Sequence, residues 1–335
     1  MLNRYGLTKH EVHRSFGDVT EYLNQREGDS LDTILCKTIS GFSDYILAEK
    51  PDLVVVHGDR IEAFACSISS ATNYVRCVHV EGGEVSGTID EIFRHCNTKL
   101  CTAHLVSSTT AKARVESLGE EPERIFNIGS PELDIHLEDS GISLADVKTR
   151  YEIPFSDYGV CIFHPVTSEL ETMYYQAKNL FDSLTDSSRH FVVIMPNNDP
   201  GSEDIFKVLG NLAADHFRTL PSMRFSHFSE LLKNASAIVG NSSTGVREAP
   251  FLGVPSLNVG TRQMNRSAAA SVFNAAADDN GTIQEFLRST WGMRFKTQDD
   301  FGSGSAREKF AKLLNDKVLF NLPHQKVFSD KSQES

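Results

Sequence analysis

The sequence is short of positive charge, of paired cysteines and of long apolar runs, and each shortage excludes a class of protein. Its 335 residues carry 33 Lys and Arg against 45 Asp and Glu, a formal net charge of -12. General nucleic-acid binders and anionic-membrane binders need an excess of Lys and Arg on one face, so neither class is expected. No apolar run reaches the roughly 18 residues of a membrane-spanning helix, and residues 1–6 lack the apolar core of a signal peptide. We therefore expect a cytoplasmic protein.

The six cysteines include no C-x-x-C pair. Their scatter favours buried, reduced thiols over a zinc site or a disulfide framework, and we expect none of them to be catalytic. A hydrophobic content of 40% over 335 residues is typical of a globular protein with room for two domains. The cysteines are Cys36, Cys66, Cys77, Cys96, Cys101 and Cys161.

Two apolar runs in the first half end in clusters of polar residues. Leu53–Val56 leads into His57–Arg60, and Val75–Val80 leads into Glu81–Glu84. Apolar runs of this length predict strands of a covered parallel sheet, and such sheets bind ligands beyond the carboxyl ends of their strands. The pair Gly82-Gly83 permits close backbone approach to a ligand or a positive φ. The sequence thus predicts a ligand site at this edge.

Side chains that can move a proton are concentrated in this window. They are His57, Asp59, His79, Glu81, Glu84, Asp90, Glu91 and His95. Carboxylates that converge raise one another's pKa, so that one can act as an acid while another stays a base. Taken singly, Asp59 and Glu81 could be turn caps and the histidines packing residues, but the whole cluster favours an active site. A metal-dependent phosphoesterase with His57, Asp59, His79 and His95 as ligands is a rival hypothesis.

Strands and helices alternate along the chain, which predicts an α/β protein with two doubly wound Rossmann-like domains facing a cleft. The expected strands are 53–56, 75–80, 104–106, 124–128, 159–163, 191–195, 237–239 and 256–259, with a possible strand at 19–23. The expected helices are 31–49, 61–73, 90–100, 110–118, 144–151, 168–185, 203–215, 227–234 and 306–314.

The stretch Gly240–Glu248 is the best anion-site candidate in the second half. Small residues between a strand and a helix leave backbone N–H groups and the hydroxyls of Ser242 and Ser243 facing the helix N-terminus, which favours negative charge. The alternative is ordinary helix capping. Glu248 is either a first-turn acid or a ligand of ribose hydroxyls.

Three other residues of the second half follow predicted strands. His164 and Arg262 are candidates for holding phosphate charge if they converge on the Ser242-Ser243 loop. Asn197 lies in a turn-prone cluster, so turn formation is the strong alternative for it.

Five motifs in order resemble the hydrolysing UDP-N-acetylglucosamine 2-epimerases of bacterial sialic-acid pathways and the epimerase half of the animal bifunctional epimerase/kinase. The resemblance covers nearly the whole chain, and the five motifs in this order are specific. The motifs are His57–Arg60, His79–Thr88, Phe163–Thr167, Gly240–Glu248 and Gly260–Gln263.

This resemblance implies the GT-B arrangement of two domains, with the substrate in the interdomain cleft. We expect an N-terminal domain at 1–152, a UDP-binding domain at 153–314, and a C-terminal helix at about 315–330 that packs back on the first domain. The implied reaction converts UDP-N-acetylglucosamine and water to UDP and N-acetylmannosamine, and so feeds sialic acid biosynthesis. It proceeds by anti elimination of UDP, which gives 2-acetamidoglucal, and by syn addition of water. No metal or other cofactor is implied, and the expected assembly is a homodimer or homotetramer.

The resemblance also implies roles for single residues. Asp59, Glu81 and Glu91 would perform the acid/base steps, without a division of labour among them. The leaving diphosphate would be held by His164, Ser242, Ser243 and Arg262, the ribose by Glu248, and further UDP contacts would come from Arg60 and Asn197.

The chain departs from the family pattern in two places. Asp90-Glu91 replaces the usual Asp-Asp, which changes the proton distances. The chain also starts after the family's first strand and its Gly-Thr-Arg-type loop, so the first domain is expected to be truncated. Two alternatives follow, namely the same chemistry on a UDP-linked diacetamido sugar and a non-catalytic sugar-nucleotide binder.

Overall fold

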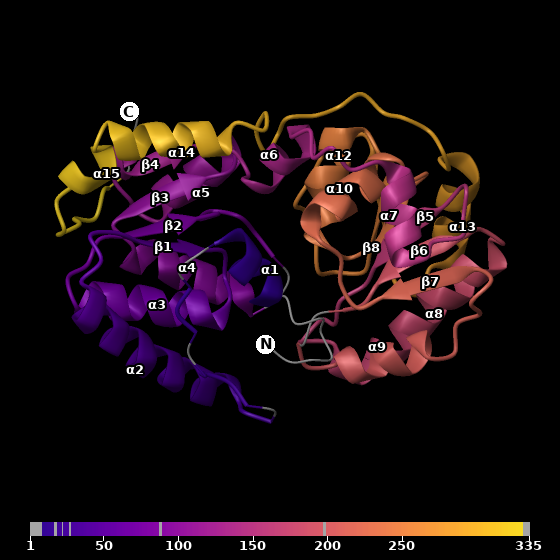
Figure 1. The fold of residues 1–335 in the computed structure, drawn as a ribbon, viewed down its shortest axis with the longest axis horizontal. Coiled ribbons are helices and arrows are strands. Elements are labelled where there is room, and N and C mark those ends of the chain that lie inside the picture. The colour runs from indigo at the N-terminus through magenta and orange to yellow at the C-terminus, as the bar shows by residue number, and fades with distance from the viewer. Residues whose placement is uncertain are drawn as a thin grey trace. The chain divides into compact units, whose positions relative to one another are not determined.

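The structure is a computed structural model that describes residues 9–16, 19–21, 23–26, 28–86, 89–196 and 199–330. These residues form two compact units, each built on its own parallel sheet (Figure 1). The first-sheet unit takes the described residues of 20–85, 89–134 and 300–335, and the second-sheet unit takes those of 1–19, 86–88 and 135–299. An α/β fold with two parallel sheets was predicted, and it is confirmed.

The first sheet has four parallel strands in the order β1-β2-β3-β4. They are β1 (Val54–His57), β2 (Cys77–Val80), β3 (Ala103–Val106) and β4 (Ile125–Asn127). Strands β2 and β3 are buried at every residue, as expected of a parallel sheet with both faces covered. The register pairs His57 with Val80 and His79 with His104, so the carboxyl ends of neighbouring strands lie together.

Helices cover both faces of this sheet. Helices α2 and α3 lie on one side and α14 and α15 on the other (Figure 1). Val54 and Val56 point to the first side, where they pack with Cys77 and Cys101, whereas Val78 and Leu105 pack against α14. The elements of the unit besides the strands are α2 (Leu31–Glu49), α3 (Ile61–Thr72), α4 (Asp90–Leu100), α5 (Thr109–Ser117), η2 (Pro122–Arg124), α14 (Ala306–Asn315), α15 (Val318–Asn321) and the start of α6 (Glu132–Leu137), whose residues from Ile135 onward belong to the second-sheet unit.

The C-terminal segment differs from the single helix predicted at about 315–330. Helices α14 and α15 precede a stretch without regular structure, because Pro323 cannot continue a helix. The chain also rejoins the first-sheet unit earlier than predicted: Ser130 N donates to Phe301 O at 2.7 Å. The predicted domain end at 314 therefore differs from the observed contacts, which place residues from 300 onward in this unit.

The predicted boundary at 152 differs as well. Residues from 135 onward belong to the second-sheet unit, where α7 (Leu144–Tyr151) places Val147 in the core. The segment between the expected helix 144–151 and the expected strand 159–163 also lies in this core, because Ile153 and Phe155 are buried there. The sequence signal for this burial is the pair of apolar side chains, Ile153 and Phe155, within an otherwise polar stretch.

The second sheet has six parallel strands in the order β10-β9-β8-β5-β6-β7. They are β5 (Gly159–Ile162), β6 (Phe191–Ile194), β7 (Phe217–Leu220), β8 (Ile238–Gly240), β9 (Ser256–Val259) and β10 (Val272–Ala275). Because β5 lies between β6 and β8, the strand order reverses there, and ligands of such sheets bind at this switch point. Alternate residues of β5 enter two separate cores, Val160 and Ile162 on one face and Cys161 on the other.

The helices of this unit cover both faces of its sheet. Besides α7 they are α1 (Lys9–Ser15), η3 (Leu170–Thr172), α8 (Met173–Asp186), α9 (Ser202–Leu209), α10 (Phe225–Lys233), α11 (Ser243–Val246), α12 (Glu248–Leu252) and α13 (Asn280–Ser289). The helix predicted at 203–215 ends at Leu209, where Gly210 follows. Of the residues described around 19–23, none is in a strand, so the strand suggested there is not observed.

All six cysteines are free, but Cys36 is exposed on α2 and therefore differs from the expected buried thiols. Within the described ranges, no helix is long and apolar enough to cross a membrane.

Candidate functional site

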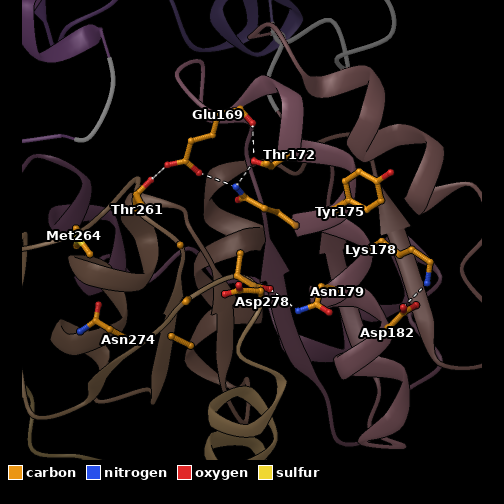
Figure 2. Close-up of a pocket in the computed structure, with 15 residues that line it drawn as sticks. Glu169, Thr172, Tyr175, Lys178, Asn179, Asp182, Thr261, Met264, Asn274 and Asp278 are labelled. Atoms are coloured by element: carbon orange, nitrogen blue, oxygen red, sulfur yellow. Dashed lines mark hydrogen bonds and ion pairs between the residues drawn. The ribbon is translucent and has the colours of Figure 1, made fainter.

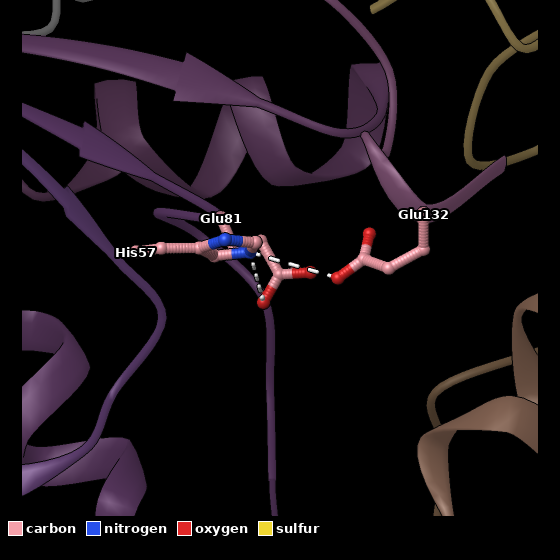
Figure 3. A group of neighbouring side chains, drawn as sticks. All are labelled: His57, Glu81 and Glu132. Carbon is pink, nitrogen blue, oxygen red and sulfur yellow. Dashed lines mark ion pairs between the residues drawn. The ribbon is translucent and has the colours of Figure 1, made fainter. Parts of the chain in front are cut away.

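Three acid/base side chains meet at the carboxyl ends of the first sheet. His57 Nε2, at the end of β1, lies 3.6 Å from Glu81 Oε2 and 3.6 Å from Glu132 Oε1 (Figure 3). Glu81 follows β2 and is only 7% exposed, and Glu132 begins α6 after β4. Glu81 also holds a φ of 68°, in the left-handed region that residues other than glycine rarely adopt.

Arg94 joins the two turns that carry the predicted catalytic acids Asp59 and Glu81. This buried arginine of α4 forms an ion pair with the Asp59 carboxylate, and its Nη1 donates to Glu81 O at 3.3 Å. One guanidinium thus fixes both the turn after β1 and the turn after β2. Arg60 begins the next helix as the N-cap residue of α3.

His79 lies beneath these residues and is fully buried. Its ring nitrogens share hydrogen bonds with Gly58 O at 2.9 Å and with Thr98 Oγ1 at 3.2 Å. Burial lowers the pKa of His79 to about 3, so the ring is neutral near pH 7. It therefore acts as a structural support of the Gly58–Asp59 turn.

The metal-ligand set of the rival phosphoesterase hypothesis is not brought together. Both nitrogens of His79 are engaged, and His95 Nε2 lies 3.5 Å from Glu91 Oε1 on α4. Among the residues that the structure describes, the one group with ligand-like spacing is His57, Glu81 and Glu132, whose ligand atoms lie within 4.8 Å of one another.

The third predicted acid, Glu91, pairs with His95, one turn further along α4. Asp90, its neighbour, stands four residues before Arg94 and therefore shares the face of the helix that Arg94 directs at Asp59. Both Asp90 and Glu91 lie about one helical turn before Arg94. The structure therefore adds Asp90 to Glu91 as a candidate for the third acid/base residue.

The glycine pair after β2 has a packing role. Gly83 has a φ of 78°, and a Cβ there would lie 2.2 Å from the carbonyl oxygen of Ala111 on α5. The next residue, Glu84, is buried and accepts a hydrogen bond from Ser107. Close approach of the loop to α5 therefore requires glycine here, whatever the ligand.

In the second-sheet unit, Asn241 ties three predicted binding loops together. Its Oδ1 accepts from His164 N at 2.6 Å, and its Nδ2 donates to His164 O at 2.8 Å. Arg262 Nη1 and Gln263 Nε2 donate to Asn241 O at 3.2 and 3.1 Å. His164, Arg262 and the loop that contains Ser242 thus converge at the carboxyl ends of β5, β8 and β9, which was the condition for a phosphate site, and their roles stay a prediction.

The Ser242-Ser243 loop is also a helix cap. Ser242 is the N-cap residue of α11, and its hydroxyl accepts from Thr244 N at 3.4 Å. Gly240 has a φ of 132°, and a Cβ there would lie 2.0 Å from Ile162 O, so β8 and β5 approach as closely as only glycine permits. Capping chemistry is therefore present, and the binding of an anion stays a prediction.

Glu248 is buried at the start of α12 and is held by two partners. Thr244 Oγ1 donates to its Oε1 at 2.9 Å, and His136 Nε2 lies 2.8 Å from its Oε2. His136 Nδ1 lies 2.8 Å from Ser229 Oγ. Because this network fixes the carboxylate, its predicted role toward ribose would be that of a preset acceptor. Asn197 lies outside the described residues.

A cavity of about 710 Å³ lies between α8 and the ends of β9 and β10 (Figure 2). Its polar lining is largely paired internally: Glu169 accepts from Thr261 and, at 2.7 Å, from Gln176. Asn179 donates to Ala277 O at 2.7 Å. None of the predicted site residues that the structure describes lines this cavity.

The sequence of the whole chain is similar to those of known proteins. Residues 8–315 match the sequence model of a family described as UDP-N-acetylglucosamine 2-epimerase. The chain is 38% identical over 334 residues to the UDP-N-acetylglucosamine 2-epimerase of Neisseria meningitidis serogroup B, covering 98% of this chain and 89% of the relative. It is 29% identical to the polysialic acid biosynthesis protein P7 of Escherichia coli, over 84% of this chain and 74% of that protein. It is 28% identical to the UDP-N,N'-diacetylbacillosamine 2-epimerase (hydrolyzing) of Legionella pneumophila, over 92% and 84%.

Solved structures show the same fold. The crystal structure of a Neisseria meningitidis UDP-GlcNAc 2-epimerase bound to UDP-GlcNAc matches with a TM-score of 0.77 at 20% identity, over 92% of this chain and 89% of that one. The Methanocaldococcus jannaschii UDP-GlcNAc 2-epimerase in complex with UDP-GlcNAc and UDP matches with a TM-score of 0.78 at 17% identity, over 94% and 90%. At these identities the likeness concerns the fold, and it agrees with the predicted GT-B type.

Proposed function

Because the chain belongs to the UDP-N-acetylglucosamine 2-epimerase family, we propose that it is a hydrolysing member that converts UDP-N-acetylglucosamine and water to UDP and N-acetylmannosamine. The observation that carries this proposal is that Arg94 pairs with the Asp59 carboxylate and binds the backbone of Glu81, whose own carboxylate lies 3.6 Å from the His57 imidazole. The Legionella relative, whose name includes "hydrolyzing", supports the reaction type. The polysialic acid protein supports a product that feeds sialic acid biosynthesis.

The chemistry needs two proton transfers and a stabilised leaving group. In the first half-reaction a base removes the C2 proton while the C1–O bond to UDP breaks, which gives 2-acetamidoglucal. In the second, a proton is added to C2 and water, on losing a proton, supplies the hydroxyl at C1. Glu81 and Asp59, with Glu91 or its neighbour Asp90, are the carboxyl groups at hand for these steps. Glu81 is well placed because it is nearly buried and its carboxylate lies beside the His57 imidazole.

We assign UDP to the loops that Asn241 joins. Arg262 and His164 supply donors for the diphosphate, and Ser242 and Ser243 add hydroxyls beside a helix N-terminus. Glu248 would accept from the ribose, and Arg60 and Asn197 would add contacts to UDP. A homodimer or homotetramer is proposed on the resemblance alone, and the cytoplasmic location stays a prediction.

The test is an incubation of the purified protein with UDP-N-acetylglucosamine in D2O, with and without a chelator. Equal release of UDP and N-acetylmannosamine, with deuterium at C2 of the sugar, is expected, because elimination loses the C2 proton to solvent. Glu81→Gln should lower turnover about 100- to 10,000-fold. Glu123→Gln is the matched control, since Glu123 is exposed on η2 in the same unit.

Other outcomes would select other functions. Release of UDP without deuterium at C2 would mean plain hydrolysis and would refute the epimerase proposal. Turnover of a UDP-linked diacetamido sugar in preference to UDP-N-acetylglucosamine would favour the substrate named for the Legionella relative. Binding of UDP without turnover of either sugar would indicate a non-catalytic binder.

A further inference from the structure

The last described residues of the chain, Leu322–Asp330, are held against the first-sheet unit although they form no helix or strand. Arg124 Nη1 and Nη2 donate to the carbonyl oxygens of Pro323 and Gln325 at 2.9 and 3.0 Å. Arg124 is itself buried. An irregular segment bound by a buried arginine is a fixed part of the unit, so its side chains can have fixed positions as well.

Lys326, a half-buried residue of this segment, directs its ammonium group into the unit. Its Nζ donates to Thr98 O at 3.0 Å and to Glu120 Oε2 at 2.7 Å. Glu120 also accepts from Lys99 at 2.6 Å and lies 2.9 Å from His104 Nε2. Burial acts to raise the pKa of Glu120, but these hydrogen bonds prevail and lower it to about 2, so the carboxylate is charged. Lys326 is therefore part of a buried ionic network at the end of α4.

Phe328 lies at the outer edge of this network. Its ring lies over Lys99, with the ammonium 5.3 Å from the ring centroid, and against Gly119, where a Cβ would lie 2.3 Å from the ring. The next residue, Ser329, donates its N–H to Gly119 O at 2.9 Å. These contacts fix the segment beside Lys99 and Glu120, although the Phe328 ring itself is 66% exposed.

A short chain of hydrogen bonds leads from Lys326 to the candidate catalytic turn. Thr98, whose carbonyl accepts from Lys326, bonds through its hydroxyl to His79, and His79 bonds to Gly58 O. Asn97, the residue before Thr98, also donates to Gly58 O, at 3.2 Å. Gly58 stands between His57 and Asp59. The last turn of α4 therefore fixes the peptide that carries both residues.

We propose that Lys326 is a positioning residue of the active site, which holds the last turn of α4 so that Thr98, Asn97 and His79 set the His57–Asp59 turn. This inference rests on the proposed function, since it concerns the rate of that reaction. Lys326 itself touches neither His57 nor Asp59. A shift of about 1 Å at a catalytic group can cost on the order of 100-fold in rate.

The test compares Lys326→Met with Lys309→Met, whose lysine is exposed on α14, in the full-length protein. Turnover is measured at a temperature at which both variants are folded by circular dichroism. We expect kcat of Lys326→Met to fall about 10- to 100-fold with little change in KM, and Lys309→Met to match the wild type. Lys326→Arg, which keeps the charge, should recover part of the loss. Equal kcat in the two Met variants would overturn the proposal and leave Lys326 a purely stabilising role.

A second measurement separates this inference from the proposed reaction. The ring nitrogens of His79 are followed by NMR of histidine-labelled protein, with His79→Gln to assign the signals. The Lys326→Met substitution should shift the His79 ring signals, and Lys309→Met should not. This readout needs no substrate, so an inactive wild type would refute the proposed function alone. Unchanged His79 signals would refute the positioning role.

Discussion

The charge on Glu120 makes a quantitative prediction for acid stability, tested by Glu120→Gln. The ordinary pKa of 4.5 falls to about 2 in the folded protein. This difference corresponds to about 3 kcal/mol of folding free energy at neutral pH. Because the folded pKa is the lower one, the stabilisation is complete above pH 4.5 and is lost as the pH falls toward 2. The substitution removes it at every pH.

The expected observable is thus a difference that depends on pH. Wild type should be more stable than Glu120→Gln by about 3 kcal/mol at pH 6, and the two should approach each other near pH 2. Burial lowers the pKa values of His79 and His104, which destabilises the protein as the pH falls below 6.5. The loss from His79 occurs in both proteins and cancels in their difference, whereas His104 contacts Glu120 at 2.9 Å, so its contribution belongs to the same network.

The assay must report on the right unit. The single tryptophan, Trp291, belongs to the second-sheet unit, so its fluorescence is blind to the network and serves as an internal control. Hydrogen exchange of the amides of β3, corrected for intrinsic exchange at each pH, gives the opening free energy of the first-sheet unit. A difference between the proteins that stays constant from pH 6 to pH 3 would refute the charge-based reasoning.

Two further predictions concern the loops around the same edge. Gly83→Ala should lower the free energy of unfolding of the first-sheet unit by at least about 2 kcal/mol, because a Cβ there would meet a carbonyl oxygen of α5 at 2.2 Å. The control is Gly28→Ala, which has a similar φ of 85° but nothing within 4 Å of the added Cβ and therefore isolates backbone strain. Equal shifts in melting temperature for the two variants would contradict the steric argument. Asp90→Asn should reduce kcat more than Glu91→Gln, since Asp90 shares the face of α4 that carries Arg94 whereas Glu91 pairs with His95; the reverse order would assign the third acid to Glu91.

The sequence allowed the inner strands of both sheets and their carboxyl ends to be predicted, because buried parallel strands are continuous apolar runs that end in polar residues. It missed β7 and β10, which are the two edge strands of the second sheet. Edge strands are covered less completely, and β10 has only one buried residue. Without a fully apolar run, a strand is not distinguished from a loop.

The site was predicted where a residue directly follows a strand, and was missed where contacts are made across the chain. Glu132 also lies beyond the carboxyl end of a strand, but it was missed because several residues separate it from the end of β4 at Asn127. The ion pair of Arg94 with Asp59 joins residues 35 positions apart, and that of Lys326 with Glu120 joins residues 206 apart. No periodicity encodes such pairs, which follow from the packing of complete elements.

The amide of Asn241 has a consequence for the exchange of loops between related proteins. The Asn241 side chain binds both backbone groups of His164, and the Asn241 backbone carbonyl accepts from Arg262 and Gln263, so the conformations of the three loops depend on one another. A graft that imports one loop from a relative with a different substrate would arrive without the neighbours that set its shape. A change of substrate specificity is therefore expected only when the three loops are exchanged together and the asparagine that connects them is kept.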